Sequence, residues 1–283
     1  YVSRRYWRQW TAALKKEFPQ VNVVGEVMDG SVPLVSFFQK GRKRFDGIDS
    51  GIDTVFDYPG FFALRHVFGE GKSMRELAYV LAQDYLYSAP EKLVTLIGSH
   101  DVQRFINEPK ATIARLRMAF TYLLTIRGTP QLYYGDEIAM RGGGDPDNRR
   151  DFPGGFPGDS HSAFSKEGRT AEEQQVFEHV RKLIALRKEL APLRRGSLMT
   201  LVADEKILVY ARVLGLDCVL MAFNNGTEKA IINVDTSSLP LKEGERLVDR
   251  LENAKEPQIK GKSVSIALAP ESAGIFDRRA NRQ

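Results

Sequence analysis

Short apolar runs alternate with longer amphipathic segments between residues 3 and 190. Four of the runs have the length and the β-branched or aromatic content of buried strands: Val21–Val24, Ile52–Tyr58, Leu93–Gly98 and Gln131–Tyr134. Strands that alternate with helices in this way are typical of parallel βα units. Four such units make up half of a (β/α)8 barrel. The pattern therefore predicts an α/β fold built on a half-barrel.

The segments between these runs have the periodicity of helices. We expect helices over Ser3–Phe18, most of Phe61–Tyr87, Ala111–Ile126 and Glu172–Leu190. In the first of these, Tyr6, Trp10 and Leu14 recur at four-residue spacing, which places them on one face. Pro19 follows directly and predicts the end of this helix.

The pattern changes after Pro192, where no helical period remains. Six short strands separated by turn residues are expected: Ser197–Val202, Ile207–Val213, Cys218–Phe223, Lys229–Val234, Glu245–Asp249 and Val264–Leu268. Such a series is typical of an antiparallel β-sandwich. We therefore predict two domains, residues 1–192 in the half-barrel and residues 193–283 in an all-β C-terminal domain. Cys218 is expected to be a buried, inert thiol.

Polar side chains follow three of the predicted parallel strands. Glu26 comes after the first run, and His100 and Asp101 come after the third. Asp136 and Glu137 follow the fourth run. Because barrel enzymes take their catalytic groups from the C-terminal ends of strands, these residues are candidates for a site. Taken alone, each also fits a plain structural interpretation, as a loop glutamate or as a core strand followed by a polar turn.

Residues 142–170 form a long predicted loop that is rich in glycine, proline and aspartate. A loop of this length inside a domain is either functional or disordered. Its segment DFPGGFPGD, residues 151–159, combines aromatic residues with prolines. We expect an ordered loop that shapes a site.

The composition excludes several classes of protein. The net charge is only +5, and the basic clusters lack the interleaved aromatic residues of a nucleic-acid platform. No apolar run approaches the roughly 18 residues that a membrane span requires. Cys218 is the only cysteine, so the chain contains no internal disulfide and no cysteine-based metal cluster. We expect neither a nucleic acid nor a membrane as a partner.

Five motifs, in order along the chain, resemble the alpha-amylase family of glycoside hydrolases. They are Gly25–Val27, Ser99–Asp101, Gly128–Glu137, Asp145–Arg149 and Leu183–Arg187. The pair SHDVQR and DPDNRR is most similar to the cyclomaltodextrinase and neopullulanase branch. The resemblance implies that this chain is the C-terminal portion of such an enzyme, with strands 5–8 of the TIM barrel followed by an antiparallel β-sandwich domain.

The resemblance also implies roles for five residues. Glu26 matches the general acid/base, and Asp101 matches the third carboxylate, which holds sugar hydroxyls. His100 would donate a hydrogen bond to the same sugar, and Asp145 and Arg149 would bind glucose units on the non-reducing side. A surface or ion-paired arginine remains an alternative for Arg149. Structural roles at the strand–loop junction are expected for Asp136 and Glu137.

The nucleophile of the family is an aspartate in a motif of the form G-F-R-x-D, which this sequence lacks. We expect it upstream of Tyr1, together with strands one to four. The chain alone would then be inactive, and the N-terminal half of the barrel would be its partner. A half-barrel also leaves open sheet edges and a large apolar surface.

The function implied is that of a retaining glycoside hydrolase acting on α-1,4-glucans, maltooligosaccharides or cyclodextrins. The alternative is a non-catalytic, amylase-like module for carbohydrate binding or protein interaction. No cofactor is assigned, and calcium stays open because the family's calcium ligands lie partly outside this sequence. Localisation stays open between cytoplasmic and periplasmic or secreted, for a protein expected to be soluble.

Overall fold

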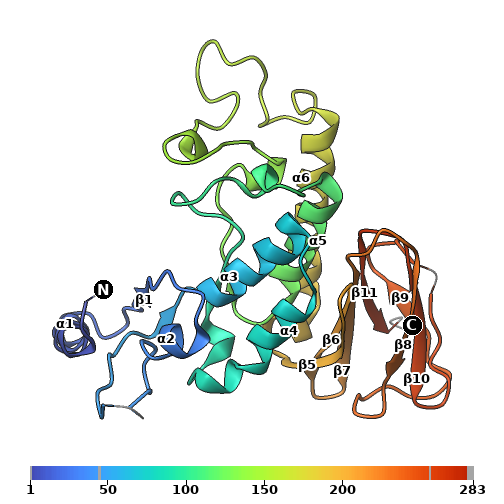
Figure 1. Ribbon diagram of the computed structural model, residues 1–283, viewed down its shortest axis with the longest axis horizontal. Helices are drawn as coiled ribbons and strands as arrows, with labels where there is room; N and C mark the ends of the chain where they lie inside the picture. The colour runs from blue at the N-terminus through green and yellow to red at the C-terminus, as the bar shows by residue number, and fades with distance from the viewer. Residues whose placement is uncertain (1, 44–45, 255, 279–283) are drawn as a thin grey trace.

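The computed structural model describes residues 2–43, 46–254 and 256–278, and Figure 1 shows how its elements are arranged. Four two-residue strands form the parallel part: β1 (Val24–Gly25), β2 (Thr54–Val55), β3 (Val94–Thr95) and β4 (Thr129–Pro130). β1 pairs with β2, and β3 pairs with β4, both in parallel. A parallel bridge between Phe56 and Val94 joins the two pairs, so the strands follow one another in chain order.

The fourth strand lies earlier than the sequence predicts. The predicted run Gln131–Tyr134 comes after β4, and only its first amide continues the ladder, donating to the Thr95 carbonyl at 2.7 Å. Beyond that point the rings of Tyr133 and Tyr134 lie against the guanidinium of Arg104. The aromatic residues that suggest a strand thus pack on a buried arginine instead.

Helices accompany these strands: α1 (Arg4–Glu17), α2 (Val32–Ser36), α3 (Tyr58–Leu64), the π-helix η1 (Arg65–Gly69), α4 (Arg75–Ala82), α5 (Ile113–Thr125), α6 (Ala171–Glu189) and α7 (Ala191–Arg195). The helical region predicted from Phe61 begins earlier, at Tyr58. The Asp57 side chain caps α3 by accepting the Gly60 amide, and Pro59 occupies its first turn, where no intrahelical donor is needed. A capping box starts α6 close to its predicted position.

The most deeply buried side chains of α1 are polar, although Trp7 also packs on the apolar cluster around Val27 and Val35. Arg4 and Thr11 are its buried residues. The Arg4 guanidinium donates to two backbone carbonyls of the segment after α2, and Thr11 Oγ1 donates to the Ser50 carbonyl at 2.9 Å. Tyr6 and Trp10 are consequently 50% and 40% exposed. The four-residue spacing does place Tyr6, Trp10 and Leu14 on one face, but Tyr6 and Trp10 are exposed there and Leu14 is half-buried.

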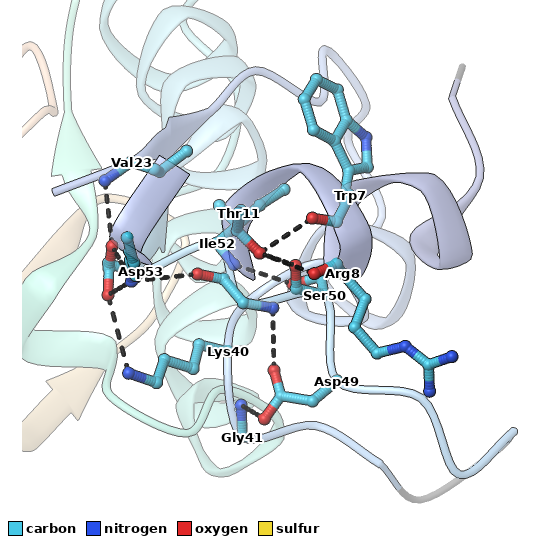
Figure 2. A network of polar contacts seen from close by, with 12 residues as sticks. Trp7, Arg8, Thr11, Val23, Lys40, Gly41, Asp49, Ser50, Ile52 and Asp53 are labelled. Carbon is cyan, nitrogen blue, oxygen red and sulfur yellow. Dashed lines mark hydrogen bonds and ion pairs between the residues drawn. The ribbon is translucent and has the colours of Figure 1, made fainter. Parts of the chain in front are cut away.

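Figure 2 shows how the segment before β2 is fastened to α1 and β1. The Asp53 carboxylate accepts the Val23 amide at 2.9 Å and lies 3.8 Å from Lys40 Nζ. The Lys40 amide donates to the Ile52 carbonyl at 2.7 Å. These contacts fix the chain where it enters β2.

Gly51 is expected to be intolerant of a side chain. Its φ is +74°, and a Cβ there would lie 2.2 Å from Thr11 Oγ1. Gly51→Ala should cost about 1–2 kcal/mol for the left-handed backbone and about 1–3 kcal/mol more for overpacking. Gly47→Ala is a matched control, because Gly47 has φ +69° and no atom within 4 Å of that Cβ. Urea unfolding should show the larger loss for Gly51→Ala, and equal losses would contradict the predicted clash.

The C-terminal part is antiparallel, as predicted. Its strands are β5 (Ser197–Ala203), β6 (Ile207–Leu214), β7 (Asp217–Asn224), β8 (Ala230–Asp235), β9 (Leu247–Asp249), β10 (Ser263–Leu268) and β11 (Ser272–Arg278). Five form a sheet in the order β5-β6-β7-β11-β9, and β10 pairs with β8. The sequence does not predict β11, which lies between β7 and β9. Cys218 is buried in β7, where desolvation raises the pKa of its thiol to about 11.

One hydrophobic core crosses the seam between the two parts of the chain. Tyr122 of α5 lies edge-on to Tyr210 and Phe223 of the sheet, with ring centroids 6.1 and 6.2 Å apart. Thr125 Oγ1 and the Tyr210 hydroxyl are 2.6 Å apart. Arg212 donates to the Thr125 carbonyl at 2.8 Å. The β-sheet is therefore packed on α5, and Figure 1 shows the sheet beside α5 and α6.

Candidate active site

Glu26 follows β1 directly and is exposed on one side of a cavity of about 190 Å³. Its Oε1 accepts a hydrogen bond from the Tyr58 hydroxyl at 2.7 Å. Desolvation raises the pKa of Tyr58, and the charges of Glu26 and Asp101 raise it further. Tyr58 is almost fully buried at the start of α3 and therefore stays a hydrogen-bond donor at neutral pH. The Tyr58 hydroxyl thus fixes the carboxyl group of Glu26.

Gly25 has a packing role that the sequence does not reveal. Its small size suggests that a substrate could approach the backbone there. In the structure, a Cβ on Gly25 would lie 3.0 Å from Ile52 Cγ2 and 3.3 Å from Val55 Cγ1. The glycine therefore allows β1 to lie close against the side chains around β2.

The other four predicted residues form one cluster. Arg149 Nε lies 2.8 Å from Asp145 Oδ1 and donates to the His100 carbonyl at 3.0 Å. Asp101 Oδ1 lies 3.3 Å from His100 Nε2 and 3.5 Å from Arg149 Nη2. All four side chains are open to solvent. Within the described residues, the hydrogen bond to Glu26 Oε1 comes from Tyr58 and not from this cluster.

Asn148 fixes the two loops of the cluster to each other. Its side chain is 0% exposed, and Nδ2 donates to the His100 carbonyl at 2.7 Å and to the Val102 carbonyl at 2.8 Å. Both loops are thereby tied together within one residue of Arg149. The sequence does not single out Asn148, because a buried asparagine between charged neighbours looks like any loop asparagine.

Arg104 is a buried side chain that supports these loops. Its guanidinium donates to the Asn148 carbonyl at 2.9 Å and to the Tyr134 carbonyl, and it pairs with Asp136 Oδ1 at 3.1 Å. Its charged carbon lies 4.2 Å from the ring centroid of Tyr133. Arg104 and Asp136 are both buried. This arrangement gives Asp136 the structural role at the strand–loop junction that the sequence suggests.

The buried Arg104–Asp136 pair should make the free energy of unfolding depend on pH. Desolvation raises the pKa of Asp136 to about 6, although the charge of Arg104 opposes it. Between pH 3.8 and about 6 the folded state then binds this proton more tightly than the unfolded chain. The stability contributed by Asp136 is therefore full below pH 3.8, falls as pH rises to about 6, and stays constant above.

Urea unfolding of the wild type and of Asp136→Asn between pH 4 and 7 measures this effect. The difference in unfolding free energy between the two proteins should shift by on the order of 2–3 kcal/mol in favour of the variant as pH rises. Groups that titrate in both proteins cancel in this comparison. A difference that is independent of pH would contradict the raised pKa.

Residues 2–43, 46–254 and 256–278 contain no group of three or more His, Cys, Asp or Glu side chains arranged to hold a metal ion. No helix within these ranges is both long enough and apolar enough to cross a membrane.

Comparison with known sequences places this geometry in a family. The family model for the alpha-amylase catalytic domain matches residues 3–196. The chain is 32% identical to a cyclomaltodextrinase of Geobacillus thermopakistaniensis over 238 residues, and 30% identical to neopullulanase 2 of Thermoactinomyces vulgaris over 237 residues. Each match covers 82% of this chain and 36% of the relative. The chain thus spans little more than a third of these relatives.

Solved structures of alpha-amylases have a similar fold. An alpha-amylase of Geobacillus thermoleovorans, determined in complex with acarbose, has a TM-score of 0.79 at 26% identity, covering 99% of this chain and 58% of that chain. An Anoxybacillus alpha-amylase has a TM-score of 0.81 at 24% identity, covering 100% and 57%, which shows the shared fold. The chain has the TIM-barrel fold of these enzymes in part, with an antiparallel C-terminal sheet. It belongs to the alpha-amylase catalytic-domain family.

Proposed function

We propose that residues 1–192 are the strand 5–8 half of the (β/α)8 barrel of a retaining alpha-glucan hydrolase, and that residues 193–283 are its all-β C-terminal domain. The chain-order parallel pairing of β1 to β4 supports the first assignment. The antiparallel sheet that starts with β5 supports the second. The observation that carries the function is that the buried Tyr58 hydroxyl donates to Glu26 Oε1 and so fixes a carboxylate at the end of β1.

Glu26 is the general acid/base of the proposed reaction. It protonates the glycosidic oxygen while an upstream aspartate attacks the anomeric carbon, and it then removes a proton from the water that releases the sugar. The hydrogen bond from Tyr58 to Oε1 orients the carboxyl group and leaves Oε2 for the proton transfer. Retention requires the two carboxyl groups to lie about 5–5.5 Å apart.

The exposed cluster holds the glucan. Asp101 and His100 bind hydroxyls of the sugar at the cleavage site, and Asp145 and Arg149 bind glucose units on the non-reducing side. The ion pair between Asp145 and Arg149 orders the guanidinium for this task. The relatives named cyclomaltodextrinase and neopullulanase support α-1,4-linked maltooligosaccharides and cyclodextrins as the substrates.

The proposed partner is the N-terminal half of the barrel. Within the described residues β1 pairs only with β2, and β4 pairs only with β3, so one edge of each is unpaired. Exposed apolar side chains also lie on α1, at its C-cap and in β1: Tyr6, Trp10, Phe18 and Val24. Unpaired edges and exposed apolar side chains are what a half-barrel presents to the half that completes it.

The chain alone should not hydrolyse maltoheptaose or β-cyclodextrin. The reason is that the proposed nucleophile comes from the partner half, and Asp101 serves the sugar hydroxyls. Purified chain is incubated with each substrate beside the matched Glu26→Gln variant, and the released sugars are quantified. Sugar release by the wild-type chain above the variant would overturn the proposed division of the active site.

A further inference from the structure

A second cavity lies far from the candidate active site, in the seam between α5, α6 and the β-sheet. Its volume is about 70 Å³, well above the ~10–15 Å³ that one water needs. Arg117 and His179 form part of its wall, and Asn253 and Glu271 line it from the β-domain. It adjoins a more open hollow of about 520 Å³ that also includes Arg117 and His179.

Arg117 is a half-buried cation without a counter-charge. Its Nε is fully buried and has no hydrogen-bond partner, and the side chain makes no ion pair within the described residues. Burial lowers the pKa of Arg117, and no neighbouring carboxylate opposes the effect. A desolvated charge in this state is costly unless a partner of opposite charge is present.

The carboxylates around the cavity are paired with other cations. Glu271 lies 2.8 Å from Arg115, Glu178 lies 2.5 Å from Arg181, and Glu252 lies 2.8 Å from Lys182. Each of these acidic side chains is neutralised by its own basic partner. The charge of Arg117 therefore remains in excess.

His179 lies in the cavity wall beside Arg117. Its Nε2 lies 3.0 Å from the Arg117 carbonyl and 2.9 Å from Thr121 Oγ1. Burial, together with the charges of Arg117 and Lys182, lowers the pKa of His179 to about 4, so its imidazole is neutral at pH 7 and leaves Arg117 as the cation of the site. The cavity wall also includes Asn253. Its Nδ2 donates one hydrogen to the Ala273 carbonyl and has a second hydrogen for another acceptor.

We propose that this seam is a binding site for a small oxyanion of the phosphate class, held by the Arg117 guanidinium between α5, α6 and the β-domain. A guanidinium presents parallel N–H donors that match two oxygens of such an ion. The smaller cavity takes the anion, and the open hollow beside it leaves room for a group attached to a phosphoryl ester. An ion bound here joins the two parts of the chain and stabilises their seam.

The test is a titration of the 283-residue chain with inorganic phosphate, with a hexose phosphate as a second arm, at pH 7 and constant ionic strength. The chain has four histidines, so their ring resonances give a simple NMR spectrum. The His179 signal, assigned with His179→Gln, should shift saturably in both arms, while those of His66 and His161 should not. Tighter binding of the hexose phosphate would identify the ester as the source, and tighter binding of inorganic phosphate would identify the free ion.

Variants make the test specific. Arg117→Gln should weaken phosphate binding at least tenfold, whereas Arg8→Gln, which removes the same charge from an exposed side chain on α1, should leave it unchanged. Asn253→Asp keeps Arg117 but places a fixed negative charge in the wall, so it should also abolish binding. The proposal is overturned if the His179 shift does not saturate, if chloride matches phosphate, or if the Arg117 and Arg8 variants bind alike.

Discussion

Replacing Glu26 by glutamine in a completed barrel is expected to lower kcat for maltoheptaose by about 10²–10⁴-fold. Glutamine keeps the shape of the side chain and can still accept the Tyr58 hydroxyl, which lies 2.7 Å from Oε1 in the wild type. It cannot supply a proton to the leaving oxygen. The loss should therefore appear in kcat, with KM little changed, in steady-state assays of released sugar.

A substrate with a better leaving group distinguishes loss of the general acid from a general loss of activity. Fluoride needs little protonation to depart, so Glu26→Gln should still react with α-maltosyl fluoride and accumulate a glycosyl-enzyme that mass spectrometry detects. Asp145→Asn is the matched control, because it removes a charge from the sugar-binding cluster and should raise KM for both substrates. Equal losses on maltoheptaose and on the fluoride would contradict the acid role of Glu26.

Arg104→Met is expected to lower the free energy of unfolding by about 3–5 kcal/mol at pH 7. The change leaves the buried Asp136 carboxyl without its partner and removes the donors to the Tyr134 and Asn148 carbonyls. Because Asp136 is more fully protonated at pH 5, the loss should shrink there. Denaturant unfolding at the two pH values measures both effects.

The double variant Arg104→Met/Asp136→Asn tests the origin of this loss. Asparagine leaves no unpaired charge, so the double variant should recover part of the stability that the single variant loses. Arg150→Met, at an exposed ion pair with Asp147, should cost no more than about 1 kcal/mol. No recovery in the double variant would show that the carbonyl contacts, rather than the buried charge pair, dominate.

The sequence predicts those features that local periodicity determines. Leu116, Phe120 and Leu123 share a helical face, and all three are buried in α5. The alternation of strands and helices likewise predicts the parallel order of β1 to β4. The motifs around His100 and Asp145 point to loops that the structure brings into contact through Arg149.

Features that depend on contacts between distant residues escape the sequence. Tyr58 reaches Glu26 over 32 positions, and Asn148 reaches the His100 carbonyl over 48. Both are buried polar side chains whose partners are fixed only by the fold. The exposure of Tyr6 and Trp10 could not be predicted for a related reason. The buried hydrogen bonds of Arg4 and Thr11 set the orientation of α1, and this orientation leaves the rings of Tyr6 and Trp10 exposed.

The most direct test of the proposed function is reconstitution of the barrel. The chain is co-expressed with the upstream half-barrel of a cyclomaltodextrinase, and hydrolysis of maltoheptaose is measured for each half alone, for the pair, and for the pair carrying Glu26→Gln. We predict activity only in the wild-type pair. Hydrolysis by this chain alone, or an undiminished rate in the Glu26→Gln pair, would contradict the assignment of this chain as the acid/base half of a divided active site.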